Sequence, residues 1–454
     1  MLWKHLPFWG LMMTVMFSGC ATYRTTAVIP EPRPLTRDYK SAATPIQQGK
    51  ADTSAFSDQN TPEVMTLPQA LALALLQNPE LAAFSFEIRA AEARALQAGL
   101  YPNPEIDVEL ENFAGSGALS GFGGTETTVS LSQSILLGGK RAKAAEAAAL
   151  EGDLAAWDYE SKRLDVFTNV RRAFLTVLAA QQRVSLNEEL TELSDQLLKT
   201  ITERVEAGKT SPAEISRARV ILSATQVELA RSRREFIASR QQLAATWGER
   251  TANFSRVTGA LDTLIRIPSA DKLRALLPQN PDLARFAAAL KQRQAVIALE
   301  DARRIPDPTI SGGVRRLSES DDNAFVVGLS IPLPFSDKNQ GARQEARIRL
   351  AQTLKTKQAV ETQLNAALSQ AYQRLSSANN ETNILKNEIL PEARKAYQTI
   401  NEGYLQGRFD FLDVLDAQRT LFEARGQFLQ ALTDFHISTT EIERLISQEI
   451  NTIR

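Results

Sequence analysis

One uninterrupted stretch of the sequence constrains the fold more than any other feature. From Gly139 to Val205 there is no proline, and Gly152 is the only internal glycine. A continuous helix over these 67 residues would be ~100 Å long, because an α-helix rises about 1.5 Å per residue. A helix of that length cannot form a globular core alone. Its faces must pack on neighbouring helices or remain in water.

The sequence also contains two similar repeats, which are about 200 residues apart. An Asn-Pro-acid triplet at 78–80 recurs at 280–282, and Pro-Asn-Pro at 102–104 recurs as Pro-Asp-Pro at 306–308. Asparagine before proline predicts a helix start, with the proline at the first helical position. The paired prolines predict the end of that helix and the start of an extended segment.

Heptad spacing marks a second helix in each repeat. Large apolar residues recur every seven positions, and small residues lie three places after them, as in a coiled-coil stripe. The large residues are Ile215, Leu222, Leu229, Phe236 and Leu243, then Val414, Leu421, Phe428, Phe435 and Ile442, shifted by 199. With turns at 207–212 and 403–408, each repeat therefore predicts a long helical hairpin. In the second hairpin, Pro391 should kink or divide the helix expected over 338–402.

Each repeat also contains two strand-like runs, where apolar and polar residues alternate. The runs are 105–113 and 127–136, then 309–317 and 325–333. About nine to eleven residues is the length that crosses a bilayer when a strand is tilted. A soluble antiparallel sheet with one wet face gives the same alternation.

Composition excludes several classes of protein. The 52 basic and 53 acidic residues leave a net charge of −1, so no basic field favours nucleic acid. One cysteine and two histidines leave no material for a His/Cys metal site or a Cys–His nucleophile. A Ser/Lys or carboxylate enzyme is not excluded, although no motif marks one. No cofactor and no resident metal are expected.

The N-terminus has the features of a secretion signal. A short polar start precedes an apolar run of signal-peptide length, which ends in Phe-Ser-Gly before Cys20. This ending resembles the bacterial lipobox, in which the cysteine is lipidated, and Ala21 after it favours sorting to the outer membrane. Ordinary secretory cleavage is the alternative. The expected divisions are a signal peptide (1–19), a lipidated linker (20–62), two repeats (63–260 and 261–447) and a tail (448–454).

Two hairpins and four strands per chain are too few to close a cylinder, because membrane barrels start at eight strands. Three copies give twelve strands and six hairpins, and both the sheet and the helical wall then close. Two copies, with eight strands, are not excluded by counting. We therefore expect a mainly α protein with a small β part, working as a ring of identical subunits around water.

Two motifs in the second repeat carry a family resemblance. Gly-Tyr-Leu-Gln-Gly at 403–407, followed by Asp-Val-Leu-Asp-Ala-Gln at 413–418, resembles the TolC family of outer-membrane efflux ducts across roughly residues 63–447. The resemblance implies a homotrimer with a twelve-stranded barrel in the outer-membrane lipids and a periplasmic α-barrel tunnel. It also implies a periplasmic adaptor protein and an inner-membrane RND-type pump as partners, and no enzymatic activity.

Three further segments, 101–105, 109–113 and 137–141, resemble the cobalt–zinc–cadmium branch of that family. This resemblance implies heavy-metal cations as cargo, with selection occurring upstream in the pump. A duct for drugs or other organic compounds is the alternative within the family. Outside it, a periplasmic adaptor lipoprotein and an enzyme using paired carboxylates are less favoured, because the chain has two hairpins and no cleft-forming pattern.

Asp413 and Asp416 are the candidate aperture residues. Three positions apart, they share a helix face, and three copies of each would form carboxylate rings that favour cations. Matching family positions line the periplasmic constriction. The alternative is a helix cap, in which Asp410 and Asp413 stabilise the positive end of the helix.

Tyr404 matches a family residue whose hydroxyl ties the two hairpins in the closed state, and its partner position here is Glu214. The alternative for Glu214 is a capping box with Ser211. The family's gating arginine position is occupied by Phe409, with Arg408 beside it.

Gly208 and Gly407 should permit the tight turns at the hairpin tips, where the resemblance places adaptor docking. On the first strand, Asp107, Glu109 and Glu111 share a face that would line the barrel lumen. The alternative is simple solvent exposure on a soluble sheet.

Overall fold

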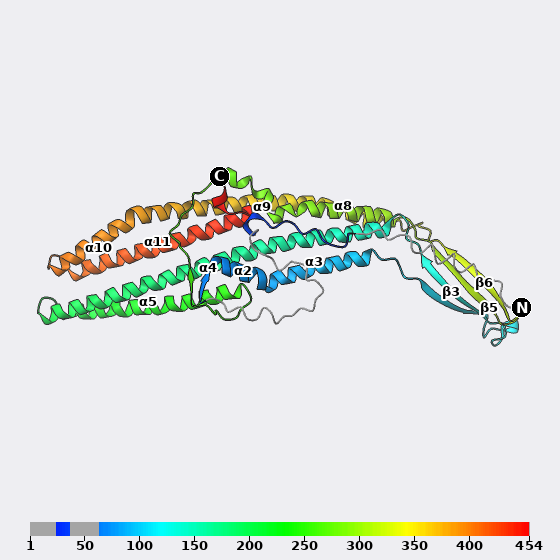
Figure 1. Ribbon diagram of the computed structural model, residues 1–454, viewed down its shortest axis with the longest axis horizontal. Coiled ribbons are helices and arrows are strands. Elements are labelled where there is room, and N and C mark those ends of the chain that lie inside the picture. The colour runs from blue at the N-terminus through cyan, green and yellow to red at the C-terminus, as the bar shows by residue number, and fades with distance from the viewer. Residues whose placement is uncertain (1–23, 37–62, 454) are drawn as a thin grey trace. The chain divides into compact units, whose positions relative to one another are not determined.

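The computed structural model describes residues 24–36 and 63–453, most of which lie in α-helices (Figure 1). The described chain forms two compact units, and each unit combines segments of both repeats. Unit 1 contains residues 24–29, 87–156 and 285–356, and unit 2 contains the remainder. The expected mainly α fold with a small β part is confirmed.

Unit 1 contains a four-stranded antiparallel sheet in the order β2-β3-β5-β6, two strands from each repeat. The central pair, β3 and β5, joins the two repeats from Glu126 opposite Leu317 to Ser134 opposite Thr309. The strands are β2 (Glu105–Glu111), β3 (Glu126–Ser134), β5 (Thr309–Leu317) and β6 (Asp322–Ser330).

The register sorts the side chains of this sheet by polarity. Directly opposed residues share a face, so Val108, Val129, Val314 and Phe325 form one apolar row across all four strands. On β6, Phe325 is 84% exposed and Val327 is 83% exposed, so no described segment covers the apolar face.

The last strand begins three residues before the expected 325 and ends at Ser330. Its early start comes from a tight turn, in which Leu317 pairs with Asp322 and Asp321 has a φ of 58°. It ends before the Pro332 and Pro334 positions, where the backbone lacks the N–H group that a ladder needs.

The long helix predicted from the sequence is present. Helix α4 runs without a break from Lys140 to Glu206 and has 67 residues. In unit 2 its second half lies alongside α5 (Pro212–Ala245), as Figure 1 shows. The first helical hairpin is therefore confirmed.

The second hairpin is interrupted where proline predicts it. Helix α9 (Gln340–Ile384) gives way to a π-helical turn (Leu385–Ile389), and α10 (Leu390–Leu405) starts with Pro391 in its first turn. A π-turn accommodates the hydrogen bond that proline cannot donate. Helix α10 then lies beside α11 (Phe411–Ile446) in Figure 1.

The two heptad stripes differ in burial. On α11 the large residues Val414, Leu421, Phe435 and Ile442 are buried. On α5 three of the four small residues (Ala218, Ser232 and Ser239) are buried, while most of the large ones are only half-buried. Within one chain, the α11 stripe is therefore the more complete core.

The shorter elements complete each unit. Strands β1 (Val64–Thr66) and β4 (Arg256–Thr258) pair in parallel and join the start of the first repeat to the segment after its hairpin. The short helices are α2 (Leu67–Gln77), α3 (Pro79–Ala98), α6 (Ala270–Arg274), α7 (Pro281–Ala284) and α8 (Phe286–Arg303).

The Asn-Pro-acid triplets occupy equivalent places in unit 2. The Asn78 amide group donates to the Thr246 carbonyl oxygen at 2.8 Å, at the end of α5. The Asn280 amide group donates to the Leu445 carbonyl oxygen at 2.9 Å, near the end of α11. Because 246 and 445 differ by the repeat spacing of 199, each asparagine links a helix start to the end of its own hairpin.

Residues 24–36, which we call the strap, are held by carboxylates. In unit 1, the Ala27 amide donates to Glu92 at 3.1 Å and the Val28 amide donates to Asp153 at 2.7 Å. A Cβ atom added at Gly152 would lie 3.2 Å from the Ala27 Cβ. The single internal glycine of α4 therefore lies where the strap crosses the helix.

The unit 2 part of the strap is anchored more deeply. The Arg33 amide donates to Glu160 at 2.8 Å, and Glu160 is only 2% exposed. The Leu35 amide donates to the carbonyl oxygen of Ser447, which ends α11 in a left-handed conformation, at 3.2 Å. The strap thus connects α4 with the C-terminal end of the last long helix.

Some sequence predictions remain untested. The expected signal peptide (1–19) and Cys20 lie outside the described residues, as does most of the linker. The division into repeats at 63–260 and 261–447 also stays a prediction, because each compact unit draws on both. Among residues 24–36 and 63–453, every helix is too short or too polar to span a lipid bilayer.

Candidate functional site

The two hairpin tips in unit 2 are built in the same way. Gly208 (φ 68°) and Gly407 (φ 77°) each follow a helix end in the left-handed conformation. The next residue closes the turn: the Lys209 amide donates to the Arg204 carbonyl oxygen, and the Arg408 amide donates to that of Gly403, both at 2.8 Å. This pattern is a Schellman motif, which explains both glycines structurally. Their role in adaptor docking stays a prediction.

Behind the turns, the four helices of the two hairpins share one apolar cluster, which we call the tip cluster. Its members come from α4, α5, α10 and α11, so the two hairpins of one chain pack together near their tips. The buried members are Ile201, Ala218, Tyr404, Phe411 and Val414.

Tyr404 lies in this cluster with 3% of its surface exposed. Its hydroxyl and the Glu214 Oε2 atom are both buried, and neither has a hydrogen-bond partner among the described residues. Burial is the main reason that the pKa of Tyr404 is raised; the Arg204 charge opposes the rise and the Glu214 charge adds to it. The Tyr404–Glu214 tie therefore stays a prediction, with the two residues close enough for their charges to interact.

The Glu214 capping alternative can be compared with the geometry. The Ser211 hydroxyl accepts the Ala213 amide at 3.3 Å, and the Glu214 amide donates to the Ser211 carbonyl oxygen. Thus Ser211 caps α5, while one Glu214 carboxylate oxygen is buried without a hydrogen-bond partner among the described residues.

Arg204, at the end of α4, makes a polar contact between the tips of the two hairpins. Its Nη1 atom donates to the Tyr404 carbonyl oxygen at 2.9 Å. Its Cζ atom lies 4.5 Å from the centre of the Tyr404 ring, a cation–π arrangement. One side chain therefore binds both the backbone and the ring of the same residue on α10.

Asp413 and Asp416 lie exposed on the first turns of α11. The Asp413 Oδ2 atom accepts the Asp410 amide at 2.9 Å, so Asp413 forms a capping box with the N-cap residue Asp410. Capping and lining an aperture are compatible, because Asp413 and Asp416 are both exposed. The aperture role requires further copies of the chain and stays a prediction.

Phe409, at the position of the family's gating arginine, packs within its own hairpin. A Cβ atom at Gly403 would lie 2.7 Å from the Phe409 Cε2 atom, so only glycine fits beneath the ring. An aromatic contact thus occupies the place where the resemblance implies a charged one.

On the sheet, the predicted acidic face exists, but it is partly neutralised. Asp107, Glu109 and Glu111 point to the face opposite the apolar row. Arg315 of β5 binds Glu111 at 2.9 Å and Glu126 at 2.8 Å. Asp107 and Glu109 remain exposed, and a position lining a barrel lumen stays a prediction for all three.

Comparison with known proteins decides the family. The sequence profile of the family described as outer membrane efflux protein matches residues 70–249 and 273–448, which cover both repeats. The chain belongs to the outer membrane efflux protein family. Its function is efflux through an outer-membrane channel, and its relatives are named as transport and resistance proteins rather than enzymes.

Several relatives of this efflux protein are named for resistance to metals. The cobalt-zinc-cadmium resistance protein CzcC of Cupriavidus metallidurans is 34% identical over 385 residues, which cover 85% of this chain and 90% of CzcC. The pyoverdine export outer membrane protein OpmQ of Pseudomonas aeruginosa is 25% identical, with 80% and 81% covered.

Solved channels have the same fold as this efflux protein. A structure of CusC gives a TM-score of 0.70 at 18% identity, covering 93% of this chain and 97% of that one. The outer membrane protein VceC of Vibrio cholerae gives 0.69 at 16%, covering 85% and 96%. These likenesses establish the fold, which the sequence repeats had predicted.

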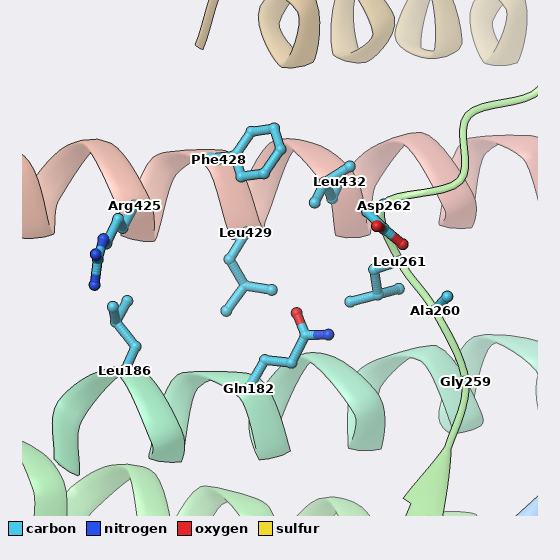
Figure 2. A pocket seen from close by; sticks show the side chains of 10 residues that line it. All are labelled: Gln182, Leu186, Gly259, Ala260, Leu261, Asp262, Arg425, Phe428, Leu429 and Leu432. Carbon is cyan, nitrogen blue, oxygen red and sulfur yellow. The ribbon is translucent and has the colours of Figure 1, made fainter. Parts of the chain in front are cut away.

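Unit 2 of the efflux protein also has a pocket of about 460 Å³ between α4, α11 and the segment 259–262 (Figure 2). In Figure 2, Gln182 of α4 and Leu429 of α11 point toward each other across it, and Arg425 lies at one end. Arg425 is already bound to Glu189 at 2.7 Å. None of the site residues predicted from the sequence lines this pocket.

Sequence reasoning missed Arg204, because a charged residue near the end of a helix is usually explained by the helix dipole. The sequence signal that could have identified Arg204 is its position. It lies in the last helical turn before the first hairpin tip, as Tyr404 does before the second. Among the described residues, no group of three or more His, Cys, Asp or Glu side chains could hold a metal ion.

Proposed function

We propose that three copies of this chain form a passive exit duct for heavy-metal cations in the outer membrane. The duct would receive its cargo from a periplasmic adaptor and an inner-membrane RND-type pump. The observation that carries the proposal is the sheet in unit 1. Its apolar face is exposed on all four strands, and among the described residues β2 and β6 each pair on one side only.

A sheet of this kind is incomplete in a single subunit. Exposed apolar rows and free edges favour association, and closure of the sheet removes both. Three sheets give the twelve strands predicted from the sequence, with the apolar face toward lipid and the polar face toward water. The strand lengths of seven to nine residues fit a tilted crossing approximately.

The cargo is proposed from the relatives. The 34% identical relative is named for cobalt, zinc and cadmium resistance, whereas a relative named for pyoverdine export is only 25% identical. Export of organic compounds is therefore the second candidate. A duct for metal cations needs no resident metal site, because passage through wet space requires only a favourable charge along the wall.

Asp413 and Asp416 would supply that charge at the inner end. In a trimer they give two rings of three carboxylates, one turn apart on α11. Opening would separate the tips of the hairpins and widen these rings. We further propose that Cys20 carries a lipid that anchors the assembly, since its surroundings resemble a lipobox.

Single-channel recording in planar bilayers tests the aperture. Asp413→Asn and Asp416→Asn should each lower the preference for cations over anions, because each removes three charges from the trimer. Asp271→Asn is the matched control, since this residue lies on α6 and carries the same charge change. Unchanged cation preference in both aperture variants would remove the assignment.

Cargo and assembly need separate measurements. Native mass spectrometry of the detergent-solubilised protein should give a trimer, and a monomer would refute the duct. A deletion strain carrying the gene should regain growth on zinc, cobalt or cadmium but not on a panel of dyes. Rescue on dyes alone would favour the organic-compound alternative.

A further inference from the structure

The contact between Arg204 and Tyr404 joins the two hairpins within one subunit. Arg204 comes from the last turn of α4, and Tyr404 from the last turns of α10, so the contact spans the tips of both repeats. The guanidinium group binds the Tyr404 carbonyl oxygen at 2.9 Å and covers its ring at 4.5 Å. Because the guanidinium is planar and has several donors, one side chain makes both contacts at once.

The polar groups around this contact do not duplicate it. Phe409 packs on Gly403 of its own hairpin, and the Tyr404 hydroxyl and a Glu214 oxygen lack hydrogen-bond partners among the described residues. Farther back along α4, fifteen residues before Arg204, Glu189 binds Arg425 of α11 at 2.7 Å. That ion pair joins the same hairpins well away from the tips.

We propose that Arg204 is the latch that keeps the two hairpin tips of a subunit together and sets how readily the inner end of the duct opens. The contact itself is present in the structure, whereas its effect on the opening of the duct rests on the proposed function. The tip cluster that Arg204 covers contains Phe411 and Val414 of α11, which flank the predicted aperture residue Asp413. Release of the latch therefore frees the helix that carries the carboxylate ring.

Arg204 can be removed without breaking the turn. The Tyr404 carbonyl oxygen also accepts the Gly407 amide at 3.0 Å, so it keeps a hydrogen-bond donor in the Arg204→Ala variant. The loss of a hydrogen bond and a cation–π contact together should raise the fraction of separated tips by roughly tenfold. Arg204→Lys keeps the charge but not the planar group, and it should lie between wild type and Arg204→Ala.

Two readouts on the full-length protein test the latch. One is single-channel conductance and open fraction in planar bilayers. The other is the rate of trypsin cleavage after Lys209 and Arg408, which lie exposed in the two tip turns. Arg204→Ala should raise both, while Arg425→Ala, which removes an inter-hairpin contact away from the tips, should leave both at wild-type values.

The Tyr404→Phe variant separates this latch from the Tyr404–Glu214 tie. It keeps the ring and the backbone carbonyl but removes the hydroxyl, so the latch predicts no change in either readout. Increased opening in Tyr404→Phe with unchanged Arg204→Ala would overturn the latch in favour of the hydroxyl tie. Arg204→Ala behaving like wild type in the cleavage assay would also overturn it. A wild-type protein that forms no channel would instead refute the proposed function, while the cleavage rates still test the latch.

Discussion

Replacing Asn280 with alanine should destabilise the end of α11 far more than the same change at Asn78 destabilises the end of α5. The two residues are equivalent in the repeats and make the same two kinds of contact. Each accepts a backbone amide at the start of its helix, and each donates to a carbonyl oxygen at the end of its hairpin. They differ in burial, because Asn280 is 0% exposed and Asn78 is half-buried.

The size of the effect follows from these contacts. Loss of an N-cap acceptor costs about 0.5–2 kcal/mol, and a neutral hydrogen bond contributes about 0.5–1.5 kcal/mol. At Asn280 the abandoned amide and carbonyl groups are out of reach of water, so the sum approaches about 2–4 kcal/mol. At Asn78 water replaces part of the lost bonding, and we expect about 1–2 kcal/mol.

Hydrogen exchange followed by mass spectrometry measures this difference locally. A loss of about 2–4 kcal/mol in the opening free energy speeds exchange about 30- to 700-fold in peptides covering residues 440–446. The Asn280→Asp variant is a useful companion, because it keeps the cap acceptor but places a carboxylate against the Leu445 carbonyl oxygen. Equal exchange in the Asn280→Ala and Asn78→Ala proteins would refute the reasoning that burial decides the cost.

Two further predictions concern stability. Burial lowers the pKa of His436, whose Nε2–H group donates to the Leu261 carbonyl oxygen at 2.8 Å, so the unfolded chain binds a proton more readily than the folded one. The stability that this histidine contributes is present above its ordinary pKa and is lost as pH falls below it. The thermal unfolding temperature should therefore fall between about pH 7.5 and about pH 5.5, and His436→Gln should flatten that dependence. Gly403→Ala should lower the unfolding temperature despite a helix propensity gain of about 1 kcal/mol, because the new methyl group displaces Phe409. In a Phe409→Ala background the same change should raise it, and destabilisation in both backgrounds would contradict the steric explanation.

Much of the fold could be predicted because its signals are local and periodic. The 67-residue helix was expected over 139–205 and found over 140–206, since absence of proline and a continuous polar and apolar pattern are properties of the sequence itself. The strand expected at 309–317 has those bounds in the structure. The end of β6 was misjudged, because alternation continued past the point where Pro332 prevents pairing.

The candidate site was less predictable, because it depends on which residues lie opposite one another across two hairpins. A heptad pattern gives the face of a helix, but it does not give the residue of another helix that meets it. The Arg204 contact with Tyr404 joins residues 200 positions apart, and no local rule relates them. The family resemblance directed attention to the Tyr404 hydroxyl, whereas the contacts in the structure use its ring and its backbone.

The strap has a consequence for the order in which the protein is completed. Synthesis delivers residues 24–36 first, yet Asp153 follows Val28 by 125 residues and Glu160 follows Arg33 by 127. The carbonyl oxygen that receives the Leu35 amide belongs to Ser447, near the other end of the chain. The contacts of the strap with α4 can therefore form before the last long helix has been synthesised, whereas the Leu35 contact must wait for Ser447.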